Sequence, residues 1–217
     1  MQRESVVYLA IALVAVIASY VVRDIALEGV IDRCDTDGGG ARAISACTEL
    51  IRRIPTDRVA YYNRGNAYQD LGDRDRAIAD YTKAIDINPF YAAAYNARGN
   101  ANLRGGLQEK AIADFTKAIE VDPKYALAYN NRAWTYAQIG KPTEGLPDVE
   151  KSLLLQPADA RALNTRGHIF EALGRTDEAI ADFRQSLSQN PENQDSQQAL
   201  KRLNASPQDS HAAGSVR

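Results

Sequence analysis

The stretch that decides the fold runs from residue 61 to residue 89 and reads YYNRGNAYQDLGDRDRAIADYTKAIDINP. A closely similar stretch, YNARGNANLRGGLQEKAIADFTKAIEVDP, occupies residues 95–123. The same spacing of 34 residues separates five prolines along the chain: Pro55, Pro89, Pro123, Pro157 and Pro191. A fixed period of this length is typical of a protein that is built from stacked structural repeats.

Small and aromatic residues recur at fixed places within each unit of 34 residues. The units begin at Asp24, Arg58, Ala92, Ala126 and Ala160. The eighth place holds a small residue: Gly65, Gly99, Ala133 and Gly167. The twentieth place does so too: Ala43, Ala77, Ala111, Gly145 and Ala179. The twenty-fourth place often holds a ring: Tyr81, Phe115 and Phe183. Small residues let two helices approach closely, and the rings fill the space between them.

Each unit has the pattern of two helices joined by a tight turn. Tyr61, Gly65 and Tyr68 lie on one helical face, and a second apolar face follows after residue 76. Gly72 is a typical helix end, and Asp73 is a typical first cap of the next helix. One helical hairpin cannot bury its apolar face alone, so we expect the units to stack on one another.

This spacing resembles the tetratricopeptide repeat, strongly over residues 56–191 and weakly over residues 24–55. The resemblance implies an all-α fold, a right-handed superhelical solenoid of helix-turn-helix repeats. We predict a degenerate first repeat at 24–57 and four repeats at 58–191. A capping helix at 192–204 and a disordered tail at 205–217 are expected to follow.

The N-terminal segment differs from the repeats because residues 6–22 carry no charged side chain. A helix of that length spans roughly 25 Å, close to the ~30 Å of a bilayer core. We favour an uncleaved transmembrane anchor at residues 1–23, because the apolar run continues past Ala18 and few positive charges precede it. A signal peptide that is cleaved after Ala18 is the alternative.

The only two cysteines, Cys34 and Cys47, fall in the degenerate first unit at places where later units carry rings. Both are therefore expected inside the same hairpin, where a disulfide would contribute about 3 kcal/mol. Two small buried thiols are the alternative. Because disulfides persist in oxidising compartments, we predict a bacterial inner-membrane protein with its repeats in the periplasm. Secretion to the periplasm after signal cleavage is the alternative location.

The sequence contains no recognisable reaction centre. We find no nucleophile with a matching base, no cluster of metal ligands and no phosphate-binding glycine loop, so we expect no enzyme, no cofactor, no metal and no small-molecule substrate. The net charge of −2 gives no reason to expect nucleic-acid binding. We interpret His168 as a solvated surface residue and not as a catalyst.

The family resemblance implies that the first helices of successive units line a concave groove. Its ligand-contacting places correspond here to these residues: Tyr62, Asn66, Asn96, Asn100, Asn130, Trp134, Asn164 and His168. The asparagines are expected to face out of the core of their own helix pair, where their amides would match the donor and acceptor of a peptide backbone. Trp134 would be an aromatic anchor. The alternative is that the asparagines only solvate this face.

We therefore predict a membrane-tethered scaffold that holds an extended segment of another protein in its groove. A structural envelope protein that assembles with itself and takes no peptide is the alternative. The groove lacks the lysines expected for a C-terminal carboxylate ligand, although Arg104 and Arg161 leave that ligand open.

A second pattern concerns charge. An arginine recurs at the seventh place and an aspartate at the twenty-third: Arg64, Arg98, Arg132 and Arg166 with Asp80, Asp114, Asp148 and Asp182. We predict four ion pairs within the hairpins, worth about 0 to 1 kcal/mol each if they are exposed. A phosphate-binding row of arginines is the alternative.

Overall fold

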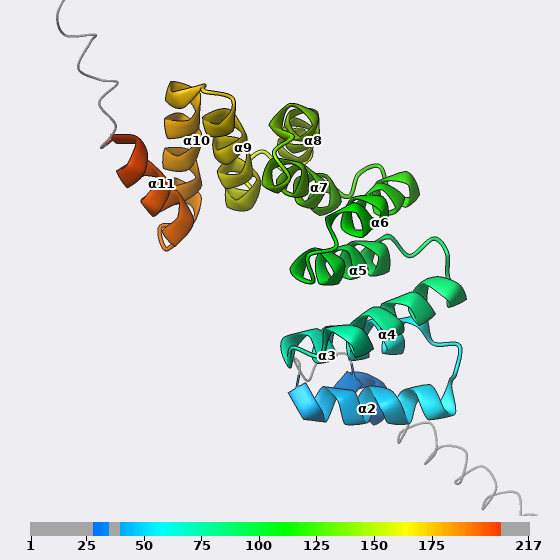
Figure 1. Ribbon diagram of the computed structural model, residues 1–217. Coiled ribbons are helices and arrows are strands. Elements are labelled where there is room, and N and C mark those ends of the chain that lie inside the picture. The colour runs from blue at the N-terminus through cyan, green and yellow to red at the C-terminus, as the bar shows by residue number, and fades with distance from the viewer. Residues whose placement is uncertain (1–27, 35–39, 205–217) are drawn as a thin grey trace, which may run out of the picture. The chain divides into compact units, whose positions relative to one another are not determined.

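The computed structural model describes residues 28–34 and 40–204, and every regular element within them is a helix (Figure 1). The all-α, repeat-based fold class predicted from the sequence is confirmed for these residues. None of the described helices is both long and apolar enough to cross a membrane. The predicted anchor at 1–23 and the predicted tail at 205–217 lie outside the described residues, so both stay predictions.

The described residues divide into two compact units, which meet in sequence between Phe90 and Tyr91. The first contains helical residues 28–34 and three longer helices: α2 (Gly40–Arg53), α3 (Arg58–Asp70) and α4 (Arg74–Ile87). The second contains seven: α5 (Ala92–Arg104), α6 (Gln108–Val121), α7 (Ala126–Gln138), α8 (Pro142–Leu155), α9 (Ala160–Ala172), α10 (Thr176–Gln189) and α11 (Gln194–Asn204). In each unit, helices that follow one another in the chain pack together as hairpins (Figure 1).

Turn chemistry defines where the helices begin and end, as the sequence predicts. Gly72 follows α3 with a φ of 78°, a left-handed conformation that glycine adopts without strain. The carboxylate of Asp73 then accepts a hydrogen bond from the backbone N–H of Arg76 at 3.1 Å, which caps α4. Asp57 caps α3 in the same way through the N–H groups of Val59 and Ala60.

Close contact between a glycine and an aromatic ring sets the packing inside the hairpins. A Cβ atom placed on Gly65 would lie 2.6 Å from Cε1 of Tyr81. The same 2.6 Å approach recurs twice in the second unit, between Gly99 and Phe115 and between Gly167 and Phe183. In the hairpin of α7 and α8, Ala133 and Val149 occupy these two places, and both are fully buried. In this hairpin the residue at the glycine place is larger than in the others, and the residue at the ring place is smaller.

The four predicted ion pairs are present, and they are more sheltered than expected. Arg64 donates from Nε and Nη2 to the two carboxylate oxygens of Asp80, both at 2.8 Å. The same pairing recurs three times: Arg98–Asp114, Arg132–Asp148 and Arg166–Asp182. The aspartate side chains are only 6–11% exposed, so the figure of about 0 to 1 kcal/mol for exposed pairs does not apply, and removing either partner would leave a buried charge.

The arginine of a hairpin also reaches the hairpin before it. Nη1 of Arg64 donates to the hydroxyl of Thr48 on α2 at 3.1 Å. Nη1 of Arg132 donates to Thr116 on α6 at 2.9 Å. Each of these arginines therefore joins three helices, because it pairs within its own hairpin and bonds to the preceding one.

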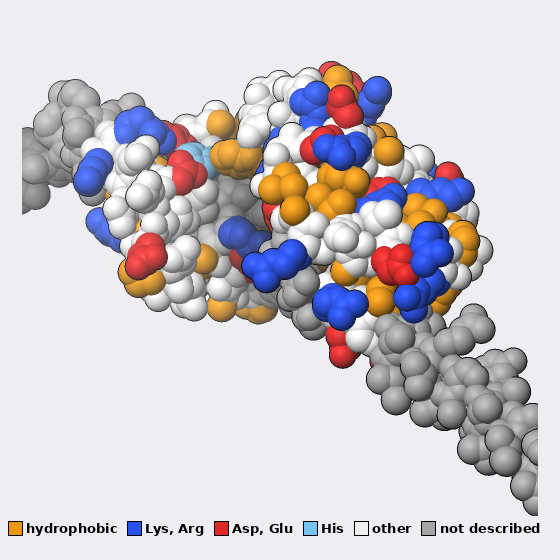
Figure 2. All heavy atoms as spheres, turned by 90° about the horizontal axis from the view of Figure 1, so that it is seen from below, with side chains coloured by type: hydrophobic (Ala, Val, Ile, Leu, Met, Phe, Trp, Pro, Cys, Tyr) orange, Lys and Arg blue, Asp and Glu red, His pale blue; other side chains and the backbone are white. Residues whose placement is uncertain are grey.

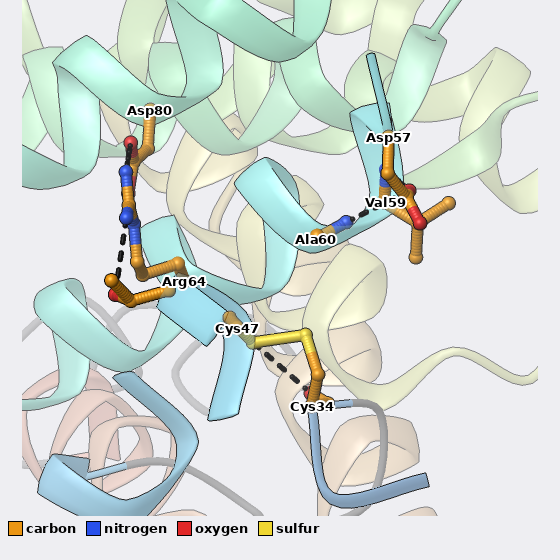
Figure 3. The surroundings of a disulfide bond; sticks show 8 residues. Cys34, Cys47, Asp57, Val59, Ala60, Arg64 and Asp80 are labelled. Atoms are coloured by element: carbon orange, nitrogen blue, oxygen red, sulfur yellow. Dashed lines mark hydrogen bonds and ion pairs between the residues drawn. A yellow bond between two sulfur atoms is a disulfide. The ribbon is translucent and has the colours of Figure 1, made fainter. Parts of the chain in front are cut away.

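A disulfide joins Cys34 to Cys47 within the first unit, with their Cα atoms 4.7 Å apart (Figure 3). Cys47 is fully buried and packs with Val30, Leu50 and Ala60. The predicted bridge is confirmed, and it lies in the interior of the hairpin. Figure 3 also shows the Arg64–Asp80 pair and the Asp57 cap of α3 in its surroundings.

Candidate functional site

The candidate site is a hollow of about 350 Å³ in the second unit, called here the α7–α9 pocket. Two helices and the segment before α11 supply its lining: Asn130, Asn131, Trp134, Arg161, Asn164, Thr165, Asn190 and Asn193. Five of these eight residues are asparagines, and one side chain is charged. The lining is therefore rich in hydrogen-bonding groups around a single aromatic ring.

Asn130, from α7, has a buried amide oxygen that accepts no hydrogen bond in the described part of the chain. Its side chain is buried, with 6% of the residue exposed, and no donor reaches its Oδ1 within the described part of the chain. A buried amide oxygen without a hydrogen bond is costly, on the order of 1 to 3 kcal/mol. Trp134 lies one helical turn further along α7 and is half-buried. Its ring meets that of His168 edge-on, with the centroids 5.5 Å apart.

Arg161 brings positive charge to the edge of the pocket from the first turn of α9. Its Nε and Nη2 donate to the carboxylate of Asp159 at 3.3 and 3.1 Å, although 67% of the arginine side chain is exposed. Burial raises the pKa of Asp159, but the hydrogen bonds from the side chain and backbone of Arg161 outweigh it and lower the pKa overall. The charged pair therefore persists at neutral pH and holds Arg161 in place.

Helix α11 occupies the neighbouring part of the surface, over α9. Oδ2 of Asp195 accepts from Nδ2 of Asn164 at 2.8 Å and lies 2.8 Å from Nε2 of His168. The hydroxyl of Ser196 donates to Oδ1 of Asn164 at 2.6 Å. A bidentate pair between Arg202 and Glu171 holds α11 further along. Both ends of the Asn164 amide are thus bonded to residues of the chain itself.

The eight predicted groove residues have different surroundings. Asn130, Trp134 and Asn164 line the α7–α9 pocket, and His168 contacts Trp134 beside it. Asn96 is 4% exposed, and its Oδ1 accepts from Nδ2 of Asn131 at 2.9 Å. Asn96 and Asn130 are both buried, because the following hairpin packs against them.

The other predicted groove residues do not line this pocket. Asn100 lies on α5 and is half-buried. Tyr62 and Asn66 belong to the first unit, where Oδ1 of Asn66 accepts from the hydroxyl of Tyr81 at 2.8 Å. The ring centroid of Tyr62 lies 5.9 Å from that of Tyr81. These two residues therefore take part in the packing of their own hairpin.

Sequence reasoning missed the contribution of Asp195 and Ser196. The signal was available, because α11 begins at Gln194, which is 34 residues after the start of α9 at Ala160. The period therefore continues into the capping helix, and its second and third residues lie against α9 as a further repeat would. Asn190 and Asn193 were also missed, because turn residues were not considered.

Metal and charge patterns do not indicate another kind of site. Across residues 28–34 and 40–204, no group of three or more histidine, cysteine, aspartate or glutamate side chains could hold a metal ion. On the face seen in Figure 2, acidic and basic side chains are interspersed and do not gather into a patch of one sign. The α7–α9 pocket is therefore the feature on which a functional interpretation can rest.

Models of the tetratricopeptide repeat match residues 59–91, 92–125, 115–146 and 160–193, which together make up more than half of the chain. The chain belongs to the tetratricopeptide repeat family. Among curated proteins, none matches this sequence.

Solved structures of similar fold include other tetratricopeptide repeat proteins. The crystal structure of MamA is 26% identical, covers 77% of this chain and 92% of its own, and has a TM-score of 0.64. YrrB, described as a tetratricopeptide repeat protein with an unusual peptide-binding site, is 23% identical, covers 79% and 89%, and has a TM-score of 0.64. The first repeat domain of Spaghetti (RPAP3), bound to the HSP90 peptide SRMEEVD, is 26% identical, covers 52% and 90%, and has a TM-score of 0.51. The family and these neighbours support a protein-interaction scaffold.

Proposed function

We propose that the chain is a membrane-tethered scaffold that holds an extended segment of a partner protein in the α7–α9 pocket. The observation that carries the proposal is the amide oxygen of Asn130, which accepts no hydrogen bond and lies beside Trp134 in a hollow of about 350 Å³. A peptide backbone offers both a donor and an acceptor, which are the two groups that an asparagine amide can satisfy. The peptide bound by the similar RPAP3 domain supports this kind of ligand.

The residues that surround Asn130 fit such a segment. Trp134 is half-buried and supplies a flat apolar surface of the kind that dominates binding energy. Arg161 is exposed at the edge and can pair with an acidic group of the partner. Because the neighbouring Asn164 is already bonded to α11, we place the centre of the contact at α7.

A pair of matched arginine substitutions tests the proposal. Arg161→Ala removes a pocket residue, whereas Arg184→Ala removes an arginine that is exposed on α10 and does not line the pocket. Partners crosslinked in cells and quantified by mass spectrometry should fall at least tenfold with Arg161→Ala and with Trp134→Ala. They should stay at the wild-type level with Arg184→Ala. Equal capture by all four proteins, with unchanged circular dichroism, would contradict the proposal.

We also propose that the N-terminal segment anchors the protein in a bacterial inner membrane with the repeats in the periplasm. The buried Cys34–Cys47 disulfide supports an oxidising compartment. The protein should stay in the membrane fraction after an alkaline wash, and thiol labelling of protein taken directly from cells should find no free thiol. A soluble species beginning near Ser19 would exclude the anchor, and labelling of both cysteines would exclude the compartment.

A further inference from the structure

The contact between α11 and α9 shows which groups satisfy an asparagine at the fifth place of a repeat. The carboxylate of Asp195 accepts from Nδ2 of Asn164, and the hydroxyl of Ser196 donates to its Oδ1. His168, one turn further on, adds a second contact to the same carboxylate oxygen at 2.8 Å. An aspartate followed by a serine therefore supplies both the acceptor and the donor that the amide needs.

Asn130 occupies the same place on α7, and its Oδ1 lacks a donor like that of Ser196. The first helix of the next repeat, α9, carries Arg161 and Ala162 where α11 carries Asp195 and Ser196. Ala162 has no hydroxyl to donate, and Arg161 has no acceptor. Ala162 therefore cannot donate to Oδ1 of Asn130 as Ser196 does to Asn164, and that oxygen is buried without a partner. The difference between α9 and α11 also replaces the carboxylate of Asp195 by the guanidinium of Arg161, which pairs with Asp159 but stays 67% exposed and so can bind an acidic group from outside.

The sequence contains a second copy of the segment that satisfies Asn164. The tripeptide Gln-Asp-Ser occurs at residues 194–196, at the start of α11, and again at residues 208–210. We propose that the α7–α9 pocket of one copy of this chain binds residues 208–210 of a second copy. The carboxylate of Asp209 would accept from Asn130 and Arg161, and Ser210 would supply a hydroxyl donor to the same amide. The inference rests on the proposed function, because it names the segment that the pocket holds.

Chain length favours a second copy over the same chain. Asn190 and Asn193 line the pocket, so it lies near the N-terminal end of α11, whereas the tail leaves from Asn204 at the other end. The 11 residues of α11 span roughly 15 Å, and passing α9 adds about another 10 Å. The five residue steps from Asn204 to Asp209 reach about 17 Å when fully extended. The tail therefore has no spare length for turning round the helix end, which favours the pocket of a second copy.

Such a contact joins two different surfaces, the tail of one copy and the pocket of the next. A contact of this kind leaves a free tail and a free pocket at the two ends, so association proceeds beyond a dimer unless a ring closes. The interaction involves charges at an exposed edge, so salt should weaken it.

The first experiment uses a synthetic peptide of residues 205–217 as the probe. The receptor is the full chain carrying Asp209→Asn and Ser210→Ala, so that its own tail does not compete. Trp134 is the only tryptophan of the chain and lines the pocket, and the peptide contains none, so fluorescence reports on Trp134 alone. We expect a saturable change with the wild-type peptide. At least tenfold weaker binding is expected for the Asp209→Asn peptide, and also for the wild-type peptide with an Asn130→Ala receptor.

Controls separate this inference from a structural effect and from the proposed function. A receptor with Arg184→Ala should bind the peptide as the parent does, and one with Arg161→Ala should bind it at least tenfold more weakly. No saturable change, or equal binding of the wild-type and Asp209→Asn peptides, overturns the inference. If partner capture still depends on Trp134 and Arg161 in that case, the proposed function stands and only the identity of the segment is wrong.

Sedimentation then tests the second copy. The mass of the wild-type chain should increase with concentration, and that of the Asp209→Asn, Ser210→Ala double variant should not. A wild-type chain that stays monomeric at the concentrations where the peptide binds overturns assembly through the tail.

Discussion

Replacing Gly99 by alanine should destabilise the second unit, although alanine is the better helix former. The new Cβ would lie 2.6 Å from Cε1, 2.8 Å from Cδ1 and 3.1 Å from Cζ of Phe115. Phe115 is fully buried, so its ring cannot move aside without disturbing its neighbours. Overpacking of this kind costs about 1 to 3 kcal/mol, whereas the gain in helix propensity is about 1 kcal/mol. We expect a net loss of about 1 kcal/mol in the free energy of unfolding.

The hairpin of α7 and α8 supplies the matched rescue. There Ala133 lies where the other hairpins have glycine, and Val149 lies where they have a ring. Phe115→Val alone should leave a cavity and cost about 2 kcal/mol. Combined with Gly99→Ala, it should cost less than the sum of the two single changes, with a coupling of about 1 to 2 kcal/mol.

Urea unfolding followed by the fluorescence of Trp134 measures all four proteins of this cycle, because the only tryptophan lies in the same unit. Two results would refute the reasoning. One is a Gly99→Ala protein that is about 1 kcal/mol more stable than wild type, as expected for an unobstructed helix position. The other is a double variant whose loss equals the sum of the single losses.

Three further outcomes are expected. Reducing the Cys34–Cys47 bridge should cost the first unit about 3 kcal/mol, seen as faster amide exchange in α2, and unchanged exchange would contradict this. Burial raises the pKa of Asp195, but hydrogen bonds from Asn164 and His168 lower it overall. The Asp195 carboxylate therefore stabilises the α9–α11 contact above its usual pKa of 3.8, and this stabilisation is lost as the pH falls below that value. Asp195→Asn should therefore speed exchange in α11 at neutral pH, and its effect should shrink as the pH falls below 3.8. Arg98→Ala should cost about 2 to 3 kcal/mol in urea unfolding because it leaves the buried Asp114 carboxylate with the hydrogen bond from Asn102 but without its counter-charge, and a loss under about 0.5 kcal/mol would mean that the pair is not needed.

The repeat period predicts most of the fold because it determines several features at once. The spacing of Gly65 and Tyr81 indicates where two helices touch, and the sequence Gly72-Asp73 indicates where one ends and the next begins. The ion pairs and the disulfide follow from the same register, because residues at equal places in a hairpin lie at equal places in space. Each of these contacts joins two residues of the same hairpin, which is why a pattern in the sequence can reveal it.

Contacts between hairpins were less predictable. The place of Asn130 in its repeat is the same as that of Asn164, yet one amide has an unbonded oxygen and the other is bonded at both ends. The two asparagines differ in the residue that faces them from the next helix but one, which is Ala162 on α9 for Asn130 and Ser196 on α11 for Asn164. The 34-residue period also continues unchanged across the division between Phe90 and Tyr91, so the period does not predict that division. The repeat pattern predicts the contacts that all units have in common, whereas the candidate site depends on residues that differ between units.

The hydrogen bond between an arginine and the threonine of the preceding hairpin affects how repeats can be added to the chain in evolution. Thr48 bonds to Arg64 and Thr116 bonds to Arg132, in each case 16 residues further along. A duplicated unit inserted after either threonine would present its own arginine to that threonine and its own threonine to the next arginine. This hydrogen bond would therefore need no compensating substitution if the gene gained a repeat at these junctions. The junction before Arg166 differs, since the residue 16 positions earlier is Glu150, so a unit copied there would meet a carboxylate and not a hydroxyl.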